Sequence, residues 1–148
     1  MFSSKIMDYV ISRAELISGN EVPVFSVVAI DSNIISESQN YVEKFNKPWM
    51  HAEFLALQEA CELLNSKYLD NADIYINLEP CSFCAAMLEK VRIKNIFFGA
   101  YDPKCGAIIH NSRIFDHSTT KPNIIGGIQE ERCSNIISGF FKNIRKND

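Results

Sequence analysis

The chain has 148 residues, of which 47% are hydrophobic and 22% charged, and its formal net charge is −3. This length and balance predict one soluble globular domain over residues 1–148, with a single sizeable core. They exclude a general nucleic-acid coating protein, while leaving room for a local basic patch that binds one RNA.

The first part of the chain predicts a helix followed by a β-hairpin. Apolar residues recur at helical spacing within residues 3–18, namely Ile6, Val10, Ala14 and Ile17. Residues 22–30 are rich in β-branched side chains and predict a buried strand. Residues 31–33 are a turn signal, so we expect residues 34–39 to return as the second strand of a hairpin.

A polar loop over residues 40–48 follows the hairpin and begins with Asn40. The amide of this residue carries a donor and an acceptor together, and it is able to bind a base edge or a ribose. An asparagine in a polar stretch is also typical of a plain turn, and its position alone favours that simpler role.

The remainder of the chain predicts alternating helices and strands. We expect helices over residues 51–67, 82–90 and 128–146, strands over residues 74–78, 95–100 and 123–125, and a loop or short helix over residues 102–110. Leu63 and Leu64 are expected on the apolar side of the first of these helices, and Phe97 and Phe98 on opposite faces of a strand. Strand–helix–strand crossovers imply parallel pairing, whereas the hairpin implies an antiparallel pair. We therefore predict an α/β fold, a three-layer α/β/α sandwich with a mixed sheet.

Two short motifs frame the central part of the chain: a His-x-Glu run that begins at His51, and a Pro-Cys-x-x-Cys run that ends at Cys84. One imidazole and two thiolates are ligands that zinc prefers, and a catalytic zinc uses three protein ligands with a fourth position open for water. Cys81 and Cys84 are three residues apart, so at the start of a helix both sulfurs can face one side. This pair of motifs is the known signature of zinc-dependent nucleobase deaminases.

Glu53 is the residue that distinguishes a catalytic zinc site from a structural one. Zinc lowers the pKa of bound water to about 7, and a carboxylate beside that water can take its proton and pass it to a leaving amine. A structural site has no need of this glutamate and usually has a fourth protein ligand. A redox-active cysteine pair, or half of a structural zinc site, is the alternative interpretation.

Several further segments match one family. Besides the zinc motifs they are residues 21–24, Asn40, residues 78–87, residues 98–104, and residues 126–128 leading to Phe140 and Phe141. With them the chain resembles the cytidine-deaminase-like superfamily over nearly its whole length and, within it, the bacterial tRNA-specific adenosine deaminases. The zinc motifs are specific to the superfamily, whereas the later segments indicate the tRNA branch.

The resemblance implies a sandwich with a sheet of about five strands, a zinc ion in each subunit, and a homodimer. It implies hydrolytic deamination of adenosine to inosine at the wobble position of an arginine tRNA, with the tRNA anticodon stem-loop as the partner. It assigns zinc ligation to His51, Cys81 and Cys84, and proton shuttling to Glu53.

Substrate contacts are also implied by the resemblance. Asn40 aligns with a base-contacting asparagine, which reverses the simpler role favoured by its position alone. Asp102 and Lys104 match a loop that approaches the anticodon, and Phe141 and Arg145 belong to a matching terminal helix that lies beside the RNA.

Two segments depart from the family pattern. Phe25-Ser26 stands where the family has Gly-Ala, and residues 47–50 read Lys-Pro-Trp-Met where it has Asp-Pro-Thr-Ala. We expect both changes at the rim of the pocket, where they affect the choice of substrate more than the reaction. A deaminase of a free nucleobase or nucleoside, of the guanine or cytosine type, shares the metal motifs and is the alternative function. A non-catalytic, zinc-stabilised RNA-binding subunit is a third hypothesis, against which Glu53 argues.

Five cysteines without a recognisable signal peptide indicate a reducing, cytoplasmic setting. Cys61 and Cys133 fall on apolar helix faces and are expected in the core, whereas Cys105 lies in a loop. No apolar run reaches membrane-spanning length. His110 and His117 lie in polar stretches and are expected to be exposed and without a role.

Overall fold

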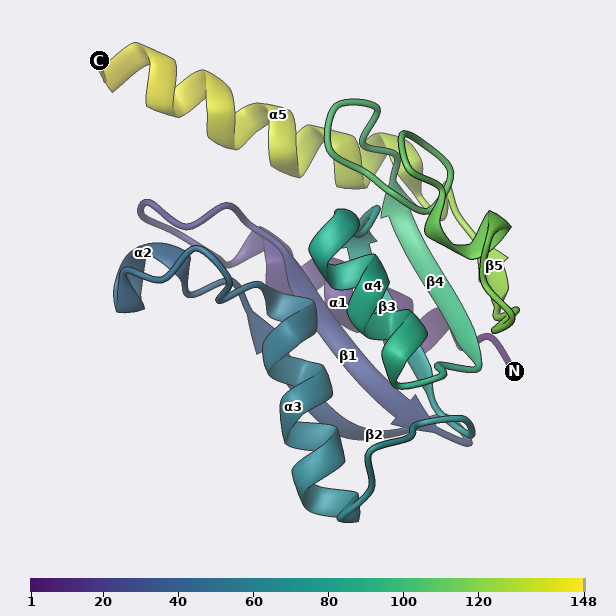
Figure 1. The fold of residues 1–148 in the computed structure, drawn as a ribbon. Helices are drawn as coiled ribbons and strands as arrows, with labels where there is room; N and C mark the ends of the chain where they lie inside the picture. Colours follow the sequence, from purple (N-terminus) through teal and green to yellow (C-terminus); the bar gives the residue numbers. More distant parts are fainter. Residues whose placement is uncertain (148) are drawn as a thin grey trace.

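One mixed sheet forms the centre of the computed structural model, which describes residues 1–147. Its strands are β1 (Phe25–Ile30), β2 (Asn33–Gln39), β3 (Asp73–Leu78), β4 (Asn95–Ala100) and β5 (Asn123–Ile125), in the spatial order β2-β1-β3-β4-β5 (Figure 1). β1 pairs antiparallel with both β2 and β3, whereas β3, β4 and β5 run parallel. The predicted mixed sheet is therefore confirmed, and the hairpin supplies its antiparallel part.

Helices cover both faces of this sheet, as the sandwich prediction requires (Figure 1). α1 (Ser4–Glu15) and the first turns of α5 (Glu130–Asn147) pack on one face, and α3 (Ala52–Leu64) and α4 (Ser82–Lys90) on the other. Phe97 belongs to the core beside α1 and Phe98 to the core beside α3 and α4, because successive residues of a strand point to opposite faces. Within residues 1–147, no helix is both long enough and apolar enough to cross a membrane.

α3 differs from its prediction in length and in the side chains that it buries. It ends at Leu64 because Asn65 adopts a left-handed conformation (φ 47°) that stops the helix. Leu63 and Leu64 are 63% and 41% exposed, so the apolar role expected for them is wrong. The buried face is made instead by Ala56 and Ala60, one turn apart, which leaves the leucines of the last turn pointing outward.

A buried asparagine on β3 explains why β1 begins at Phe25 and not at residue 22. Asn77 Oδ1 accepts a hydrogen bond from the Phe25 N–H (2.8 Å), and Asn77 Nδ2 donates to the Pro23 carbonyl (2.9 Å). The Val24 N–H donates to the carbonyl of Val22 (2.8 Å), so this backbone forms a tight local turn. A polar side chain distant in the sequence therefore replaces the strand pairing predicted for these residues.

A short helix, α2 (Val42–Phe45), occupies part of the predicted loop over residues 40–48. The Glu21 carboxylate accepts hydrogen bonds from the N–H groups of Glu43 (3.0 Å) and Lys44 (2.9 Å). These groups have no partner within a helix of one turn, so a residue from before the hairpin satisfies them. The short helix therefore depends on a contact that local sequence patterns do not reveal.

The core placement of Cys133 is confirmed. Cys133 is fully buried where α5 packs on β4, opposite Gly99. A Cβ at Gly99 would lie 2.9 Å from the Cβ of Cys133 and 2.8 Å from the Asn77 carbonyl oxygen, so a larger residue would push the helix away. Cys61 is partly buried at the edge of the other core, and Cys105 is exposed.

Candidate active site

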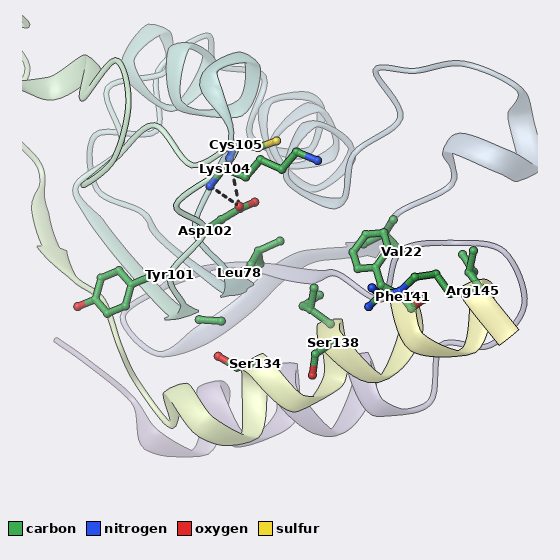
Figure 2. A pocket seen from close by; sticks show the side chains of 13 residues that line it. Val22, Leu78, Tyr101, Asp102, Lys104, Cys105, Ser134, Ser138, Phe141 and Arg145 are labelled. Atoms are coloured by element: carbon green, nitrogen blue, oxygen red, sulfur yellow. Dashed lines mark hydrogen bonds between the residues drawn. The ribbon is translucent and has the colours of Figure 1, made fainter.

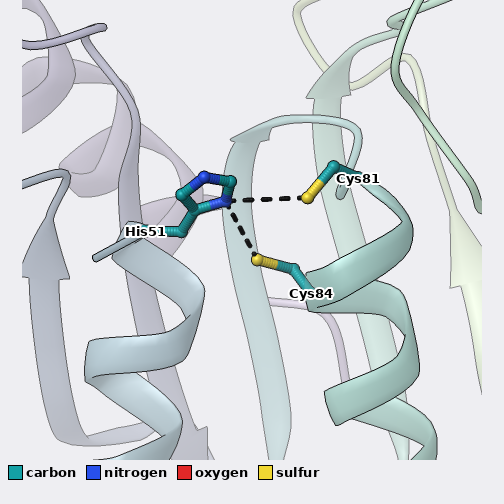
Figure 3. Close-up of side chains that lie close together, drawn as sticks. All are labelled: His51, Cys81 and Cys84. Atoms are coloured by element: carbon teal, nitrogen blue, oxygen red, sulfur yellow. Dashed lines mark hydrogen bonds between the residues drawn. The ribbon is translucent and has the colours of Figure 1, made fainter. Parts of the chain in front are cut away.

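His51, Cys81 and Cys84 meet at the starts of two helices on one face of the sheet (Figure 3). His51 immediately precedes α3, Cys81 immediately precedes α4, and Cys84 lies in the first turn of α4. His51 Nδ1 lies 3.6 Å from Cys81 Sγ and 3.4 Å from Cys84 Sγ. The structure therefore brings together the imidazole and the two thiols that the motifs predict.

The spacing of these atoms fits zinc. In tetrahedral zinc sites Zn–N is about 2.0–2.1 Å and Zn–S about 2.3 Å, which places the nitrogen and each sulfur roughly 3.5 Å apart. The observed separations of 3.6 and 3.4 Å lie on either side of this value. In the part of the chain that the structure describes, no fourth histidine, cysteine or acidic residue joins the cluster. Three protein ligands with an open position are typical of a catalytic zinc site.

The three residues shift one another's pKa values, and one of the two thiols is strongly acidified. A hydrogen bond from the Cys84 thiol lowers the pKa of Cys81 to about 4, and the same interaction raises the pKa of Cys84. The hydrogen bond with Cys81 raises the pKa of His51, although burial acts in the opposite sense. The N-termini of α3 and α4 both point at the cluster, where their partial positive charge stabilises thiolates.

Glu53 lies in the first turn of α3 and is 4% exposed. Burial raises the pKa of its carboxyl group, and the negative charge of Cys81 raises it further. The Glu53 carboxylate also interacts with the thiol of Cys84, which places it directly beside the metal-binding atoms. A buried carboxyl group with a raised pKa beside a metal cluster is suited to taking up and releasing a proton.

Asn40 lies at the same helix start and is nearly buried. Its Oδ1 accepts a hydrogen bond of 2.7 Å from the N–H of Ala52, the residue between His51 and Glu53. Within residues 1–147 the amide nitrogen of Asn40 makes no hydrogen bond, so a donor is left for a substrate. The asparagine therefore fixes the helix start while presenting one polar group.

A second feature is a cavity of about 610 Å³ between α5 and the loop that follows β4 (Figure 2). Four residues that the family resemblance assigned to substrate binding line it together: Asp102, Lys104, Phe141 and Arg145. The carboxylate of Asp102 accepts hydrogen bonds from the backbone N–H groups of Lys104 (3.2 Å) and Cys105 (3.1 Å), which shapes the loop. His51, Cys81 and Cys84 do not line this cavity. Its two walls each carry one basic side chain, Lys104 on the loop and Arg145 on α5.

The two segments that depart from the family pattern lie in different places. Phe25 is buried in the core beside α1, on the opposite face of the sheet from the metal cluster, so its expected place at the pocket rim is wrong. Strand alternation puts Ser26 on the metal side, fully buried, and its Oγ has no hydrogen-bond partner within residues 1–147. Trp49 is 46% exposed, and its carbonyl accepts a hydrogen bond from the N–H of His51 (2.8 Å).

Glu79 and His110 form a hydrogen-bonded pair that the sequence analysis missed. The Oε1 atom of Glu79 and the Nδ1 atom of His110 are 2.8 Å apart, and the His110 side chain is 33% exposed, so the expectation that it is an exposed side chain is wrong. Burial alone would raise the pKa of Glu79, but hydrogen bonds from His110 and from backbone N–H groups hold that pKa below its usual value. The available signal was an acidic residue placed directly between a buried strand and Pro80.

Comparisons with known proteins agree with this geometry. Residues 3–145 match the MafB19-like deaminase family. A tRNA-specific adenosine deaminase of Rickettsia bellii is 43% identical over 140 residues, which cover 91% of this chain and 97% of that protein. A tRNA-specific adenosine deaminase of Bacillus subtilis is 34% identical, covering 85% of this chain and 80% of that protein.

Solved structures show the same similarity. A structure from work on A-to-I editing by tRNA:A34 deaminases at the wobble position superimposes with a TM-score of 0.84. It is 33% identical and covers 90% of this chain and 99% of its own. A guanine deaminase from Bacillus subtilis gives a TM-score of 0.63 at 31% identity, covering 68% of this chain and 66% of its own.

Proposed function

The chain belongs to the MafB19-like deaminases and to the tRNA-specific adenosine deaminases, and from this membership we propose that it converts adenosine to inosine at the wobble position of a tRNA. The observation that carries the proposal is the zinc-like spacing of His51, Cys81 and Cys84 with Glu53 buried beside them. These three residues would hold a zinc ion, which supplies the Lewis acidity that activates a water molecule.

The residues around the cluster account for the proton transfers of this reaction. Water adds to C6 of adenine and ammonia leaves. One proton of the water ends on N1 of the base, and the other must move to the departing amine. Glu53 takes that proton and delivers it, because its raised pKa lets it hold the proton between the two steps. The amide nitrogen of Asn40 donates to the base and orients it, while its oxygen keeps the start of α3 in place.

The cavity between α5 and the loop after β4 suits a single-stranded RNA loop. Lys104 and Arg145 supply positive charge, and Phe141, 45% exposed, offers a ring on which a base can stack. Stacking of this kind contributes about 1–3 kcal/mol per base. An anticodon loop presents unpaired bases at low cost, so the anticodon stem-loop of an arginine tRNA is the substrate we propose.

A homodimer is the second part of the proposal. Phe54 of α3 and Phe83 of α4 stack with their ring centroids 5.9 Å apart, and Phe83 is 40% exposed. Phe54 is partly buried beneath it, and an exposed aromatic residue on a helical face is typical of protein contacts. Phe83 also lies edge-on to His51, with centroids 6.0 Å apart, so the proposed contact adjoins the metal site.

Deamination of a free base is the second candidate function, because the B. subtilis guanine deaminase shares the fold at 31% identity. The two candidate functions differ in whether the substrate occupies the cavity beside α5. A tRNA would extend into this cavity, whereas a free base would not. A deaminase of free guanine would act without Lys104 and Arg145, whereas a tRNA enzyme would lose affinity for its substrate without them.

The decisive experiment is nucleoside analysis by mass spectrometry of an arginine tRNA with adenosine at the wobble position, after incubation with the purified protein. We expect inosine at that position, none with Glu53→Ala, and none from a tRNA with guanosine there. Zinc content of the Glu53→Ala protein is measured beside it and should equal that of the wild type. Absence of inosine from folded, zinc-loaded wild type, together with release of ammonia from free guanine or cytosine, would replace this proposal by the alternative. Inosine formed by Glu53→Ala would remove the proton-transfer role of the glutamate.

A further inference from the structure

We propose that Glu79 and His110 are positioning residues that hold the substrate-facing loop against the metal-binding segment and thereby set the affinity for RNA. The loop in question, residues 101–113, connects β4 to the short 3-10 turn at Ile114–Asp116 and lines the cavity beside α5. This inference rests on the proposed function, since it concerns how that substrate is held.

Glu79 is the centre of the arrangement. Its side chain is completely buried, and within residues 1–147 the hydrogen bonds of its carboxylate all go to the 101–113 loop. Its Oε2 accepts from the backbone N–H groups of Ile108 (3.1 Å), Ile109 (2.9 Å) and His110 (3.1 Å). Its Oε1 accepts from the N–H of Asp102 (3.1 Å) and from Nδ1 of His110 (2.8 Å). An ionised carboxylate offers acceptors only, and here each of its oxygens meets donors.

The same loop is bonded to the metal-binding segment next to Glu79. The Ala107 N–H donates to the Pro80 carbonyl (2.9 Å), and Gly106 forms a backbone bridge with Cys81. A Cβ at Gly106 would lie 2.6 Å from Glu79 Oε2 and 2.6 Å from the Asp102 carbonyl oxygen. The close approach of loop and carboxylate therefore requires a glycine at this position.

This packing connects two parts of the site. Asp102 and Lys104 face the cavity beside α5. The backbone N–H of Asp102 is held by Glu79, the residue directly before Pro80, and the N–H of Lys104 bonds in turn to the Asp102 carboxylate. The His110 ring packs edge-on against Tyr101, which also lines the cavity, with centroids 6.1 Å apart. The side chain of His110 contacts Glu79 and Tyr101, so a change at His110 reaches the cavity wall through these two residues.

A role in folding alone makes a different prediction. If the hydrogen bond between Glu79 and His110 only stabilises the chain, its loss lowers the unfolding temperature and leaves the KM of the remaining folded enzyme unchanged. If it positions the loop, its loss raises the KM for RNA while kcat and zinc content stay near the wild-type values, because the side chain of His110 bonds to Glu79 and not to a proposed zinc ligand or Glu53.

The experiment compares three histidine variants on an anticodon stem-loop with adenosine at the wobble position. His110→Leu keeps the bulk of the ring but loses the donor, His110→Asn keeps a donor near the position of Nδ1, and His117→Leu makes the same change at a nearby exposed histidine. We expect His110→Leu to raise KM about fivefold to twentyfold with kcat within about twofold. His110→Asn should restore KM to within about twofold of wild type, and His117→Leu should leave it unchanged. An unchanged KM in His110→Leu, or failure of His110→Asn to restore it, would overturn the inference.

Hydrogen exchange separates this inference from the proposed function. Glu79→Gln turns an NH₂ group toward backbone donors, so the amide protons of residues 102 and 108–110 should exchange faster than in wild type, with Glu59→Gln, an exposed glutamate, as the control. Faster exchange in a protein that has no activity on RNA would support the loop contact and reject only the proposed substrate. Unchanged exchange in Glu79→Gln would reject the loop contact whatever the substrate.

Discussion

Asn40 Oδ1 lies 2.7 Å from the backbone nitrogen of Ala52, so one asparagine holds the turn that carries both His51 and Glu53. The contact gives Asn40 two separable roles, an acceptor toward the protein and a donor toward the substrate. Asn40→Asp keeps the acceptor and loses the donor. We expect its free energy of unfolding to stay near the wild-type value while kcat/KM falls about 100-fold.

Asn40→Ala is the matched variant, because it loses both groups. It should show the same loss of kcat/KM and, in addition, a loss of about 1 kcal/mol in the free energy of unfolding, as for other residues that bond to a helix start. Urea denaturation and steady-state kinetics measure the two effects. Full activity of Asn40→Asp would exclude the amide nitrogen as a substrate contact.

Metal binding is tested at Cys84, which is buried and contributes one of the two sulfurs. Cys84→Ser replaces a thiolate by a hydroxyl, a poor zinc ligand, so we expect little or no zinc in the purified protein. A chelator should lower the unfolding temperature of wild type, by about 2–4 °C for each kcal/mol of binding energy lost, but not that of the variant. Cys105→Ser, the same change at an exposed cysteine, should retain full zinc content.

Ser26 and Ser36 offer a paired test of buried hydroxyl groups. Ser26 Oγ is buried and unpaired within the described residues, whereas Ser36 Oγ donates to the Ala56 carbonyl (2.7 Å). Ser26→Ala should raise the free energy of unfolding by about 1 kcal/mol, and Ser36→Ala should lower it by about the same amount. Urea midpoints with unchanged m-values measure both changes. A loss of stability in Ser26→Ala would mean that this hydroxyl has a partner in solution.

Two glycines should respond oppositely to alanine. Gly106→Ala forces a Cβ into contact with the Glu79 carboxylate, and we expect a loss of about 1–3 kcal/mol in stability. A Cβ at Gly139, in the middle of α5, would meet nothing within 4 Å. Gly139→Ala should therefore raise stability by about 0.5–1 kcal/mol. Thermal unfolding compares the two, and equal effects would contradict the close packing seen at Gly106.

The proposed dimer depends on the exposed aromatic face around Phe83. Phe83→Glu places a charge in that face and should give a monomer, as measured by light scattering after size-exclusion chromatography. Leu63→Glu makes a similar change at a more exposed apolar residue of α3 and should leave the oligomeric state as it is. A dimer that survives Phe83→Glu would place the contact elsewhere on the surface.

The sequence by itself determined the order of the main elements and the chemistry of the metal cluster. The strands over residues 95–100 and 123–125 and the helix over residues 82–90 have the predicted bounds, and the β-hairpin is present although its first strand begins three residues later than predicted. These signals are local: turn residues, side-chain alternation and helical spacing. The ligand set of His51, Cys81 and Cys84 was equally readable, since a motif fixes both the residue types and their spacing along a helix start.

Only the tertiary structure decided how distant side chains are used. Glu21, Asn77 and Glu79 each bond to backbone donors more than 20 residues away, and no local pattern predicts such partners. Phe25 stood out in the sequence as a change near the pocket, yet it packs on the opposite face of the sheet. The physical reason is the same in each case. A buried polar group is stable only when it is hydrogen-bonded, and an apolar side chain is stabilised by packing in a core. The residues that provide these contacts are distant in the sequence and are brought together only by folding.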